Sequence, residues 1–585
     1  MSDNPATAPR ARPLSRLLSQ FGNRRAIGAD LGAGTVLGVQ SVPSGLATGL
    51  LAGVNPLYGL YAYTFGMVGG ILTSSSIYMV VQATSAMAVV IADVGEVQNA
   101  VDPDRALFTL SMMIGLVMLV LGIFKLGSLV RFVPASVITG FITGTAINIV
   151  LGQLSDFTGY DGQGPGRIVR AIDTVLHIGQ WQWTTVTVGL VTVALIVGLS
   201  KTRLGAMGMV VAVIVGTAMV PVLGWSSVPT VSDIASIPSS LPAPQMPDLA
   251  AVPSLLIPAL SLTFVGLVQG AAISSSIPNP DGKFPEPSGD FRGQGVGNIA
   301  AGVFQGMPVG GSMSATAVNM SGGAKSRLAP IIAGGVMILG MIFFSELIAI
   351  VAMPVLSGVL IVVGFQIVKP AEIRAIWGTG KTSIVAMMVT FILTLIMPLQ
   401  YAVLLGVGIS IMLYVVRQSE QVRISRLVFD DQPWPIEADP PETVEPNELI
   451  VLMPYGSLFF AAAPVFEEAL PDVMPTSNRS VVVISLHGKK DLGNTFMRIL
   501  RRYNSRLVEQ DCRLYLSGVG PRVFEQLVDT GALPEIGDAN VYRDQERIGA
   551  ALIEAVAEAR KWISANDDSS SSQAAELAPD SDDEV

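Results

Sequence analysis

The chain has 585 residues, of which 50% are hydrophobic and only 14% are charged. A soluble globular protein is usually about 25% charged, so this composition excludes a wholly soluble enzyme, a disordered protein and a fibrous protein. It favours a polytopic membrane protein. The net charge of −10 disfavours nucleic acid as a partner. One cysteine and two histidines leave no intrachain disulfide and no Cys/His metal site, so we expect no metal and no cofactor.

Residues 1–25 are basic and polar and lack the apolar core of a signal peptide, so we expect a cytosolic segment that is not cleaved. Residues 26–418 alternate between apolar runs and short polar breaks, which predicts a transmembrane domain. The runs are 27–50, 57–74, 77–94, 107–125, 129–153, 182–199, 204–224, 253–277, 295–320, 328–351, 354–368, 382–397 and 399–416.

Counting 295–320 as two short segments gives a predicted total of 14 membrane segments. With the N-terminus inside, the basic residues between segments fall mainly on the cytosolic side, and Arg167 and Arg170 lie outside. Because cytosolic loops carry an excess of Lys and Arg, both termini are expected in the cytosol.

Two breaks interrupt the apolar pattern in the same way. Residues 74–76 lead into the small and polar stretch 78–86, and residues 306–316 form a similar stretch. Each break falls in the third segment of its half of the domain, which predicts an inverted repeat of seven plus seven segments. Broken helices at corresponding places in two halves indicate a transporter site.

The polar residues at these breaks are the sharpest functional signal. Free N–H groups and a partial positive charge at helix N-termini can bind an anion without Lys or Arg. The alternative is that these residues only let helices pack closely. One half-helix is expected to start with Gln82, Thr84 and Ser85, and the other with Ser312, Ser314 and Thr316.

Few ionisable residues lie near the membrane segments. Asp30 is expected to be a helix N-cap, and Asp93, Glu96 and Asp156 are expected at the surface. Glu346 lies inside an apolar run and is a candidate for a functional role. A stripe of glycines is expected to pack helices closely: Gly28, Gly32, Gly34 and Gly38.

After the membrane segments, residues 419–447 are charged and Pro-rich and are interpreted as a linker. Residues 448–563 alternate β-rich and helix-like stretches, which predicts a soluble α/β domain. The expected strands are 449–453, 458–461, 481–486 and 513–517, and the expected helices are 464–471, 493–508, 521–530 and 544–563. Residues 564–585 are predicted to be a disordered acidic tail.

Several of these motifs resemble those of the SulP anion permeases (solute carrier family 26). The resemblance is carried by residues 28–34, 42–47 and 51–61 in the first half, and by 295–302, 311–319 and 322–325 in the second. The carboxyl domain resembles the STAS domain of such permeases at Phe459, Phe460 and 518–522.

The resemblance implies a core domain and a gate domain, elevator-like alternating access, homodimers and a cytosolic STAS domain, at which a cytosolic partner is a further expectation. It implies an anion such as sulfate or bicarbonate, bound between the third and tenth segments. The residues expected to line the site are Pro43, Ser44, Thr48, Gln82, Ala83, Thr84, Ser85, Gln269, Ser312, Ser314, Ala315 and Thr316.

Three positions depart from the family pattern. Gln82 and Ala83 stand where many members have Gly-Pro, Ala315 stands for an Arg, and Gln269 stands for an acid. Without that acid no proton acceptor or sodium ligand is evident, so exchange or uniport is favoured over coupled transport. In the STAS domain, Leu492 follows the family-like Asp491, so the phosphorylated Ser of soluble relatives is missing.

These observations predict a secondary transporter of a small anion in a plasma membrane, with no enzymatic activity. The preference for Arg over Lys fits a bacterial protein. One alternative is a nucleobase permease of the same architecture, against which Gln269 and Ala315 argue. The other is a non-transporting membrane sensor whose STAS domain binds a partner.

Overall fold

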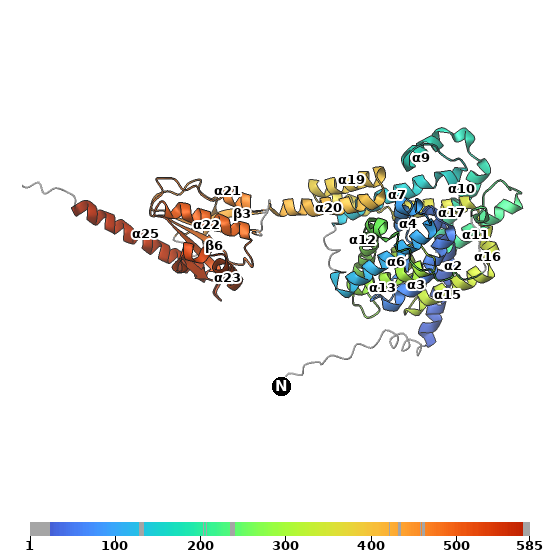
Figure 1. Cartoon of the computed structure of the whole chain (residues 1–585), viewed down its shortest axis with the longest axis horizontal. Coiled ribbons are helices and arrows are strands. Elements are labelled where there is room, and N and C mark those ends of the chain that lie inside the picture. Colours follow the sequence, from blue (N-terminus) through green and yellow to red (C-terminus); the bar gives the residue numbers. More distant parts are fainter. Residues whose placement is uncertain are drawn as a thin grey trace, which may run out of the picture. The chain divides into compact units, whose positions relative to one another are not determined.

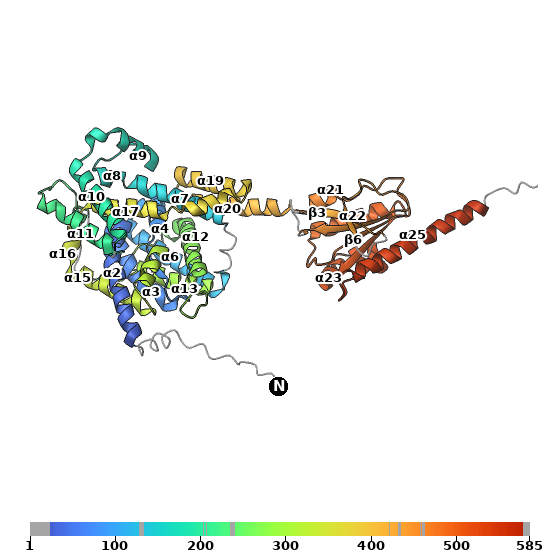
Figure 2. The same ribbon diagram turned by 180° about the vertical axis from the view of Figure 1, so that it is seen from behind.

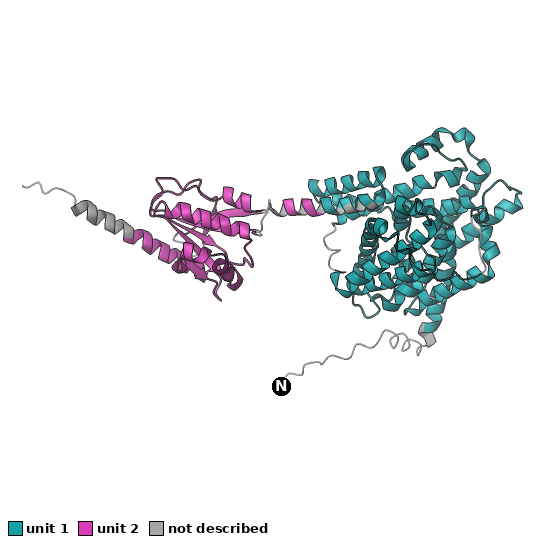
Figure 3. Ribbon diagram, viewed as in Figure 1, with its two compact units in different colours: residues 1–410 teal, residues 411–585 magenta. Residues whose placement is uncertain are grey.

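The computed structural model describes residues 24–576, apart from 128–133, 203, 206, 235–239, 420–421, 431–434, 457 and 459–461. The chain divides into two compact units, Met1–Ser410 and Ile411–Val585 (Figure 3). Most of the basic segment 1–25, the expected motif residues Phe459 and Phe460, and residues 577–585 of the expected tail therefore lie outside the described residues.

The first unit is helical, and every predicted apolar run contains a helix (Figure 1). The first half holds α2 (Arg24–Leu51), α3 (Pro56–Thr73), α4 (Ser85–Ile91), α5 (Gly95–Gln98), α6 (Pro103–Ile123), α7 (Ala135–Gly152), α8 (Leu154–Thr158), α9 (Gly166–Leu176), α10 (Trp183–Ser200) and α11 (Met207–Val222). The second half holds α12 (Val252–Ser276), α13 (Pro287–Val303), α14 (Met313–Ser321), α15 (Leu328–Phe343), α16 (Ser345–Ala349), α17 (Met353–Ile367), α18 (Pro370–Trp377), α19 (Lys381–Ile396) and the start of α20 (Leu399–Ser419). The residues of α20 after Ser410 belong to the second unit.

Several of these helices are long and apolar enough to cross a bilayer. Among the described residues, these spans are Pro103–Ile123, Ala135–Thr158, Trp183–Ser200, Val252–Ser276 and Met353–Trp377. Other helices are shorter or are interrupted. The total of 14 membrane segments therefore stays a prediction.

The helices of the first unit pack as two groups (Figure 2). In one group α13 packs against α3 and α6, α15 packs against α2 and α3, and α12 packs against α6. In the other group α10 packs against α11 and α17, and α7 packs against α17 and α19. Helices α2 and α4 link the two groups. Helix α2 packs against α15 of the first group and also contacts α11 and α17 of the second, and α4 contacts α12 of the first group and α7 of the second. This division agrees with the expected core and gate domains.

Two boundaries differ from the sequence prediction. Helix α13 starts at Pro287 rather than at 295, because its buried polar residues Asp290, Gln294 and Asn298 lower the hydropathy of a helix that lies in the core. The predicted run 328–351 ends as one helix at Phe343 and continues as α16, in whose first turn Glu346 is exposed.

The glycine stripe is a packing feature at two of its four positions. A Cβ at Gly34 would lie 2.5 Å from the Ala329 carbonyl oxygen, and one at Gly38 would lie 2.8 Å from the Ala333 carbonyl oxygen. Both glycines let α2 approach α15 closely. At Gly28 and Gly32 an added Cβ would meet nothing within 4 Å, so the packing interpretation is wrong there.

The second unit is built on a six-stranded sheet of order β4-β3-β5-β6-β7-β8. Its strands are β3 (Arg423–Val428), β4 (Ile436–Ala438), β5 (Leu449–Tyr455), β6 (Val481–Ser485), β7 (Arg513–Val519) and β8 (Val541–Arg543). Strands β5 to β8 are parallel, and β3 pairs antiparallel with both β4 and β5.

Helices cover both faces of this sheet, which buries the continuous apolar strand β6 on both sides. Ile450, Val482 and Leu514 pack under one set of helices, and Val483 and Tyr515 pack under α25. The helices are α21 (Ala463–Glu468), α22 (Asn494–Val508), α23 (Pro521–Asp529), α24 (Ala532–Ile536) and α25 (Ala550–Glu576).

Strands β3 and β4 fall inside the segment 419–447 that the sequence analysis interprets as a linker, so this segment contributes to the sheet. Strand β4 lies at the edge of the sheet, where charges and prolines are typical, and its neighbour β3 has two Arg among its six residues. Composition alone therefore predicts a linker here. Helix α25 likewise continues to Glu576, into the segment 564–585 that is predicted to be disordered. Leu458, the only described residue of the expected strand 458–461, lies outside any strand.

The close contact of α2 with α15 predicts different effects for two glycine substitutions on the same helix. Gly34→Ala would place a Cβ against the backbone of Ala329, and overpacking of this kind costs about 1–3 kcal/mol. Gly32→Ala adds the same atom in open space and gains helix propensity of up to about 1 kcal/mol. The thermal midpoint of the purified protein in detergent should therefore fall for Gly34→Ala and hold or rise for Gly32→Ala. Equal midpoints would contradict the packing geometry.

Candidate functional site

The two breaks in the apolar pattern meet in the folded chain. Strand β1 (Val80–Gln82) pairs antiparallel with β2 (Gly310–Ser312), with Val80 opposite Ser312 and Gln82 opposite Gly310. All six residues of this ribbon are buried. Helix α4 follows β1 and α14 follows β2, so the N-termini of both half-helices lie at the ribbon. The expected pattern of an extended piece entering a short helix is found at both breaks.

Glycines in β2 allow α12 to approach the ribbon. A Cβ at Gly311 would lie 3.1 Å from the Gly270 Cα, and one at Gly310 would lie 3.2 Å from Gln269 Oε1. These distances are tighter than ordinary van der Waals contact. The glycines therefore place Gln269 directly beside the strand.

Each half-helix starts with a side-chain cap. Thr84 is the N-cap of α4, and its hydroxyl accepts a hydrogen bond from the Met87 N–H at 3.3 Å. Ser312 is the N-cap of α14 and accepts from the Ala315 N–H at 3.3 Å. The first N–H groups of a helix have no acceptor within it and carry the positive end of the helix dipole.

Side chains connect the ribbon to its neighbours. Gln82 Nε2 donates to Ser312 Oγ at 3.2 Å, and Thr84 Oγ1 donates to Gln269 Oε1 at 3.1 Å. Thr316 Oγ1 accepts from the Val80 N–H at 3.1 Å. The structure thus brings the expected residues of the third and tenth segments together with Gln269 of α12.

These residues differ in how accessible they are. Ala83 and Thr316 are fully buried, Ser85 is half-buried, and Ser314 is exposed. Gln82 Oε1 is buried and has no hydrogen-bond partner among the described residues. None of the expected site residues carries a charge. A ligand here would meet hydroxyls, amides and backbone N–H groups.

The expected residues of the first segment lie on α2, which packs against α4 and α14. Pro43 is buried inside this helix. Ser44 Oγ donates to the Gln40 carbonyl at 3.1 Å, and Thr48 Oγ1 lies 3.0 Å from the Tyr63 hydroxyl. Among the described residues, no hydrogen bond joins Pro43, Ser44 or Thr48 to the ribbon.

Asp290, a fully buried carboxylate on α13, is not among the residues predicted from the sequence. It accepts hydrogen bonds from the hydroxyls of Ser74 at 2.6 Å and Ser274 at 2.5 Å, and from the Ser76 N–H at 2.7 Å. Ser75 Oγ adds a fourth at 2.8 Å. The run before β1 is thereby fixed to α13 and α12. Serine runs at 74–76 and 274–276 are the signal that could have revealed a buried acid, because such an acid needs several donors.

Asp30 is not the N-cap of its own helix. It lies within α2, is fully buried, and accepts from the Lys325 N–H at 2.6 Å, the Ser326 N–H at 3.0 Å and the Ser326 hydroxyl at 2.5 Å. These groups follow α14 and lead into α15. Asp30 therefore stabilises the far end of the second broken segment, and Arg327 Nη2 continues the network to the Ser74 carbonyl at 2.6 Å.

Two amide side chains of α13 form hydrogen bonds with the backbone of the second break. Asn298 Nδ2 donates to the Val309 carbonyl at 2.6 Å, and Asn298 Oδ1 accepts from the Val309 N–H at 2.9 Å. Gln294 Oε1 accepts from the Gly311 N–H at 3.1 Å. These side chains replace the backbone partners that a continuous helix would supply.

Asp93 is half-buried and paired, not simply at the surface. Arg167 Nη2 lies 2.8 Å from Asp93 Oδ1, and Arg167 Nη1 donates to Asp93 Oδ2 at 3.0 Å. The pair joins the end of α4 to α9. Glu96 and Asp156 are also half-buried rather than exposed. Glu346 is exposed in the first turn of α16.

In the second unit, Asp491 lies 3.3 Å from Arg522 Nη2 and accepts from Gln526 Nε2 at 2.6 Å. Leu492 is only 2% exposed and packs in the core of the domain. Leu492 therefore contributes to the hydrophobic core of the second unit.

The sequence matches the model of the sulfate permease family over residues 27–390 and that of the STAS domain over residues 440–547. The chain belongs to the sulfate permease family. It is similar to bicarbonate transporter BicA of Synechocystis sp., with 27% identity over 64% of this chain and 66% of that protein. It is also similar to chloroplastic sulfate transporter 4.1 of Arabidopsis thaliana, with 25% identity over 68% of this chain and 59% of that protein.

The fold of this chain matches a solved structure of murine solute carrier 26 family member A9 (Slc26a9), an anion transporter, in the inward-facing state. The TM-score is 0.82 at 18% identity, over 96% of each chain. This likeness covers both units and supports a helical membrane domain followed by a STAS domain.

The surroundings of Asp290 predict a large effect of a small substitution. Asp290→Asn keeps the size of the side chain but places an NH₂ group among hydroxyl and N–H donors, which should cost about 3 kcal/mol. Asp281→Asn changes an exposed carboxylate and should cost under about 0.5 kcal/mol. Thermal unfolding in detergent compares the two variants, and similar midpoints would show that Asp290 does not fix the run before β1.

Proposed function

We propose that this permease is a secondary transporter that binds a small anion, such as sulfate or bicarbonate, at the β1–β2 ribbon. The pairing of the two breaks is the observation that supports this most strongly, because it gathers two helix N-termini and several hydroxyls at one place. Each N-terminus is equivalent to roughly half a positive charge, so the pair can attract an anion without a cationic side chain.

Ser314 is the hydroxyl best placed to meet a ligand, because it is exposed in the first turn of α14. Ser85 is half-buried in the first turn of α4. In this proposal Gln82, Thr84 and Ser312 orient the two helix ends, and Gln269 closes the site from α12. Pro43, Ser44 and Thr48 line the adjoining face of α2, with Ala83, Ala315 and Thr316 forming the packed floor.

The charge content of the site bears on coupling. Gln269 is an amide next to the ribbon, so it can neither release a proton at neutral pH nor provide a charged ligand for sodium. We therefore propose exchange or uniport. Transport would follow an elevator-type motion. The group of helices that includes α3, α12 and α13, which contact the ribbon, would move against the group that includes α7, α10 and α17.

The names of the relatives support an anion as substrate and transport rather than catalysis as the activity. We propose that the protein acts as a homodimer in a bacterial plasma membrane with both termini in the cytosol. We also propose that a cytosolic partner binds the STAS domain.

A negative charge at the site tests it. Ser314→Asp should abolish uptake while the protein stays folded, because an acid in the first turn suits the helix dipole but repels an anion. At about 5 Å and an effective dielectric constant of about 20, the repulsion is about 3 kcal/mol, which is more than about a hundredfold in binding. Ser314→Asn is the matched control without charge and should retain uptake.

Uptake is measured in proteoliposomes with labelled sulfate, bicarbonate, chloride, fumarate and uracil, with and without inward Na⁺ and H⁺ gradients. Saturable anion uptake that ignores both gradients is the expected result. Normal uptake by Ser314→Asp would locate the site elsewhere, and uptake of uracil alone would favour a nucleobase permease.

A further inference from the structure

Helix α9 carries an apolar face that no other part of the described chain covers. Its exposed apolar residues are Val169, Ile172, Val175 and Leu176, with exposed fractions of 46%, 54%, 51% and 76%. Their spacing along the chain places them on one side of a helix. An exposed apolar row of this kind marks an interaction site, because in water it would promote aggregation.

The position of α9 in the chain indicates what covers this face. The helix lies between the spans Ala135–Thr158 and Trp183–Ser200, and it packs against α7 and α8. A helix that connects the end of one span to the start of the next is expected at a membrane surface. Helix α10, which follows, exposes Trp183, Leu190 and Val197 by 59%, 55% and 45%, as expected for a helix that faces lipid.

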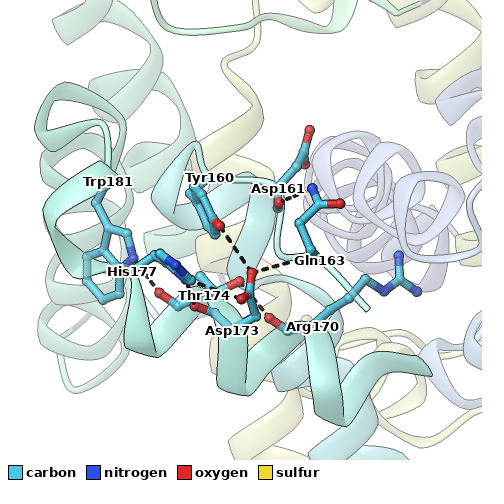
Figure 4. A network of polar contacts seen from close by, with 8 residues as sticks. All are labelled: Tyr160, Asp161, Gln163, Arg170, Asp173, Thr174, His177 and Trp181. Carbon is cyan, nitrogen blue, oxygen red and sulfur yellow. Dashed lines mark hydrogen bonds and ion pairs between the residues drawn. The ribbon is translucent and has the colours of Figure 1, made fainter. Parts of the chain in front are cut away.

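The polar side of α9 forms hydrogen bonds with the segments that precede and follow the helix (Figure 4). Asp173 accepts from the Gln163 N–H at 2.8 Å and from the Tyr160 hydroxyl at 3.1 Å, and its Oδ1 lies 3.2 Å from His177 Nδ1. Trp181 Nε1 donates to the Thr174 carbonyl at 2.9 Å. The Gln163 N–H holds the pKa of the Asp173 carboxyl below its usual range, so the carboxylate stays ionised. This network fixes which side of α9 faces outward.

A second contact fixes α9 to the helices that carry the ribbon. Arg167, near the start of α9, pairs with Asp93, which follows α4, and both side chains are half-buried. Arg167 Nη2 also donates to the Val89 carbonyl of α4 at 3.5 Å. A partly buried bidentate pair is more persistent than an exposed one. Helix α9 is thus held along its polar side and at its N-terminal end.

We propose that α9 is a membrane-surface helix whose apolar face inserts into the boundary between headgroups and acyl chains of the same bilayer that the permease spans. An amphipathic helix binds this boundary through buried apolar area. The neighbouring Trp181 and Trp183, whose ring centroids lie 6.0 Å apart, belong to the residue type that is enriched at membrane interfaces. This inference concerns the lipid contact alone and does not depend on the proposed anion site.

The test places a fluorescent probe on each side of α9. Cys512 is buried and is replaced by alanine to give a cysteine-free background. Ile172→Cys puts the probe on the apolar face, and Arg170→Cys, also an exposed position of α9, is the matched control. Both proteins are labelled with bimane, reconstituted into phosphatidylcholine and phosphatidylglycerol vesicles, and quenched by doxyl lipids or by aqueous iodide. Size-exclusion profiles and thermal midpoints establish that both variants are folded.

The expected result is loss of fluorescence at position 172 with shallow doxyl lipids and protection from iodide, and the opposite at position 170. Equal iodide quenching at both positions would overturn the proposal, because the face would then lie in water. Disulfide formation between two copies through Cys at position 172 would also overturn it, because a second copy of the chain would then cover the face.

Discussion

The structure depends on one constraint: a chain within a bilayer must satisfy its backbone N–H and C=O groups internally, because lipid offers no hydrogen-bond partner. A helix that stops halfway through the membrane violates this unless something else pairs with the freed groups. Here two short helices, α4 and α14, begin at the same place, and the extended strands that precede them pair as the ribbon of β1 and β2. The pairing satisfies the backbone and, at the same time, brings two helix N-termini together. The candidate anion site is a direct consequence.

Polar side chains around the ribbon form hydrogen bonds with backbone groups that the two short strands leave unpaired. Asn298 and Gln294 on α13 bind the backbone of β2 and the residue before it. Asp290 fixes the run before β1, and Asp30 fixes the chain after α14. These carboxylates are fully buried and accept several hydrogen bonds each, so their role is to hold the broken segments in one geometry. Such preorganisation suits a site that offers dipoles instead of charges, because weak donors must be aimed well.

The sequence predicts the apolar segments, the two breaks and the α/β nature of the second unit because each has a local signature. Small and polar residues from Gln82 to Ser85 and from Ser312 to Thr316 interrupt apolar runs, and β6 is a continuous apolar run. The sequence does not predict features that depend on distant partners. Helix α13 looks too polar near Asp290 to be a core helix until Ser74 and Ser274 are seen to satisfy that acid. Asp30 looks like a local cap because its partners lie almost three hundred residues away, at 295 and 296 positions along the chain. The edge strand β4 and its neighbour β3 are short and include charged residues, so composition does not reveal them.

We propose that helix ends and hydroxyls at the ribbon, and no cationic side chain, hold the transported anion. Anomalous diffraction from crystals grown with selenate, an isostere of sulfate, or with bromide, a monovalent anion, would test this most directly. We expect an anomalous peak within hydrogen-bonding distance of the first turn of α14, beside Ser314 and Thr84. A peak beside an Arg or Lys side chain, with none at the ribbon, from protein that transports the same anion, would contradict it.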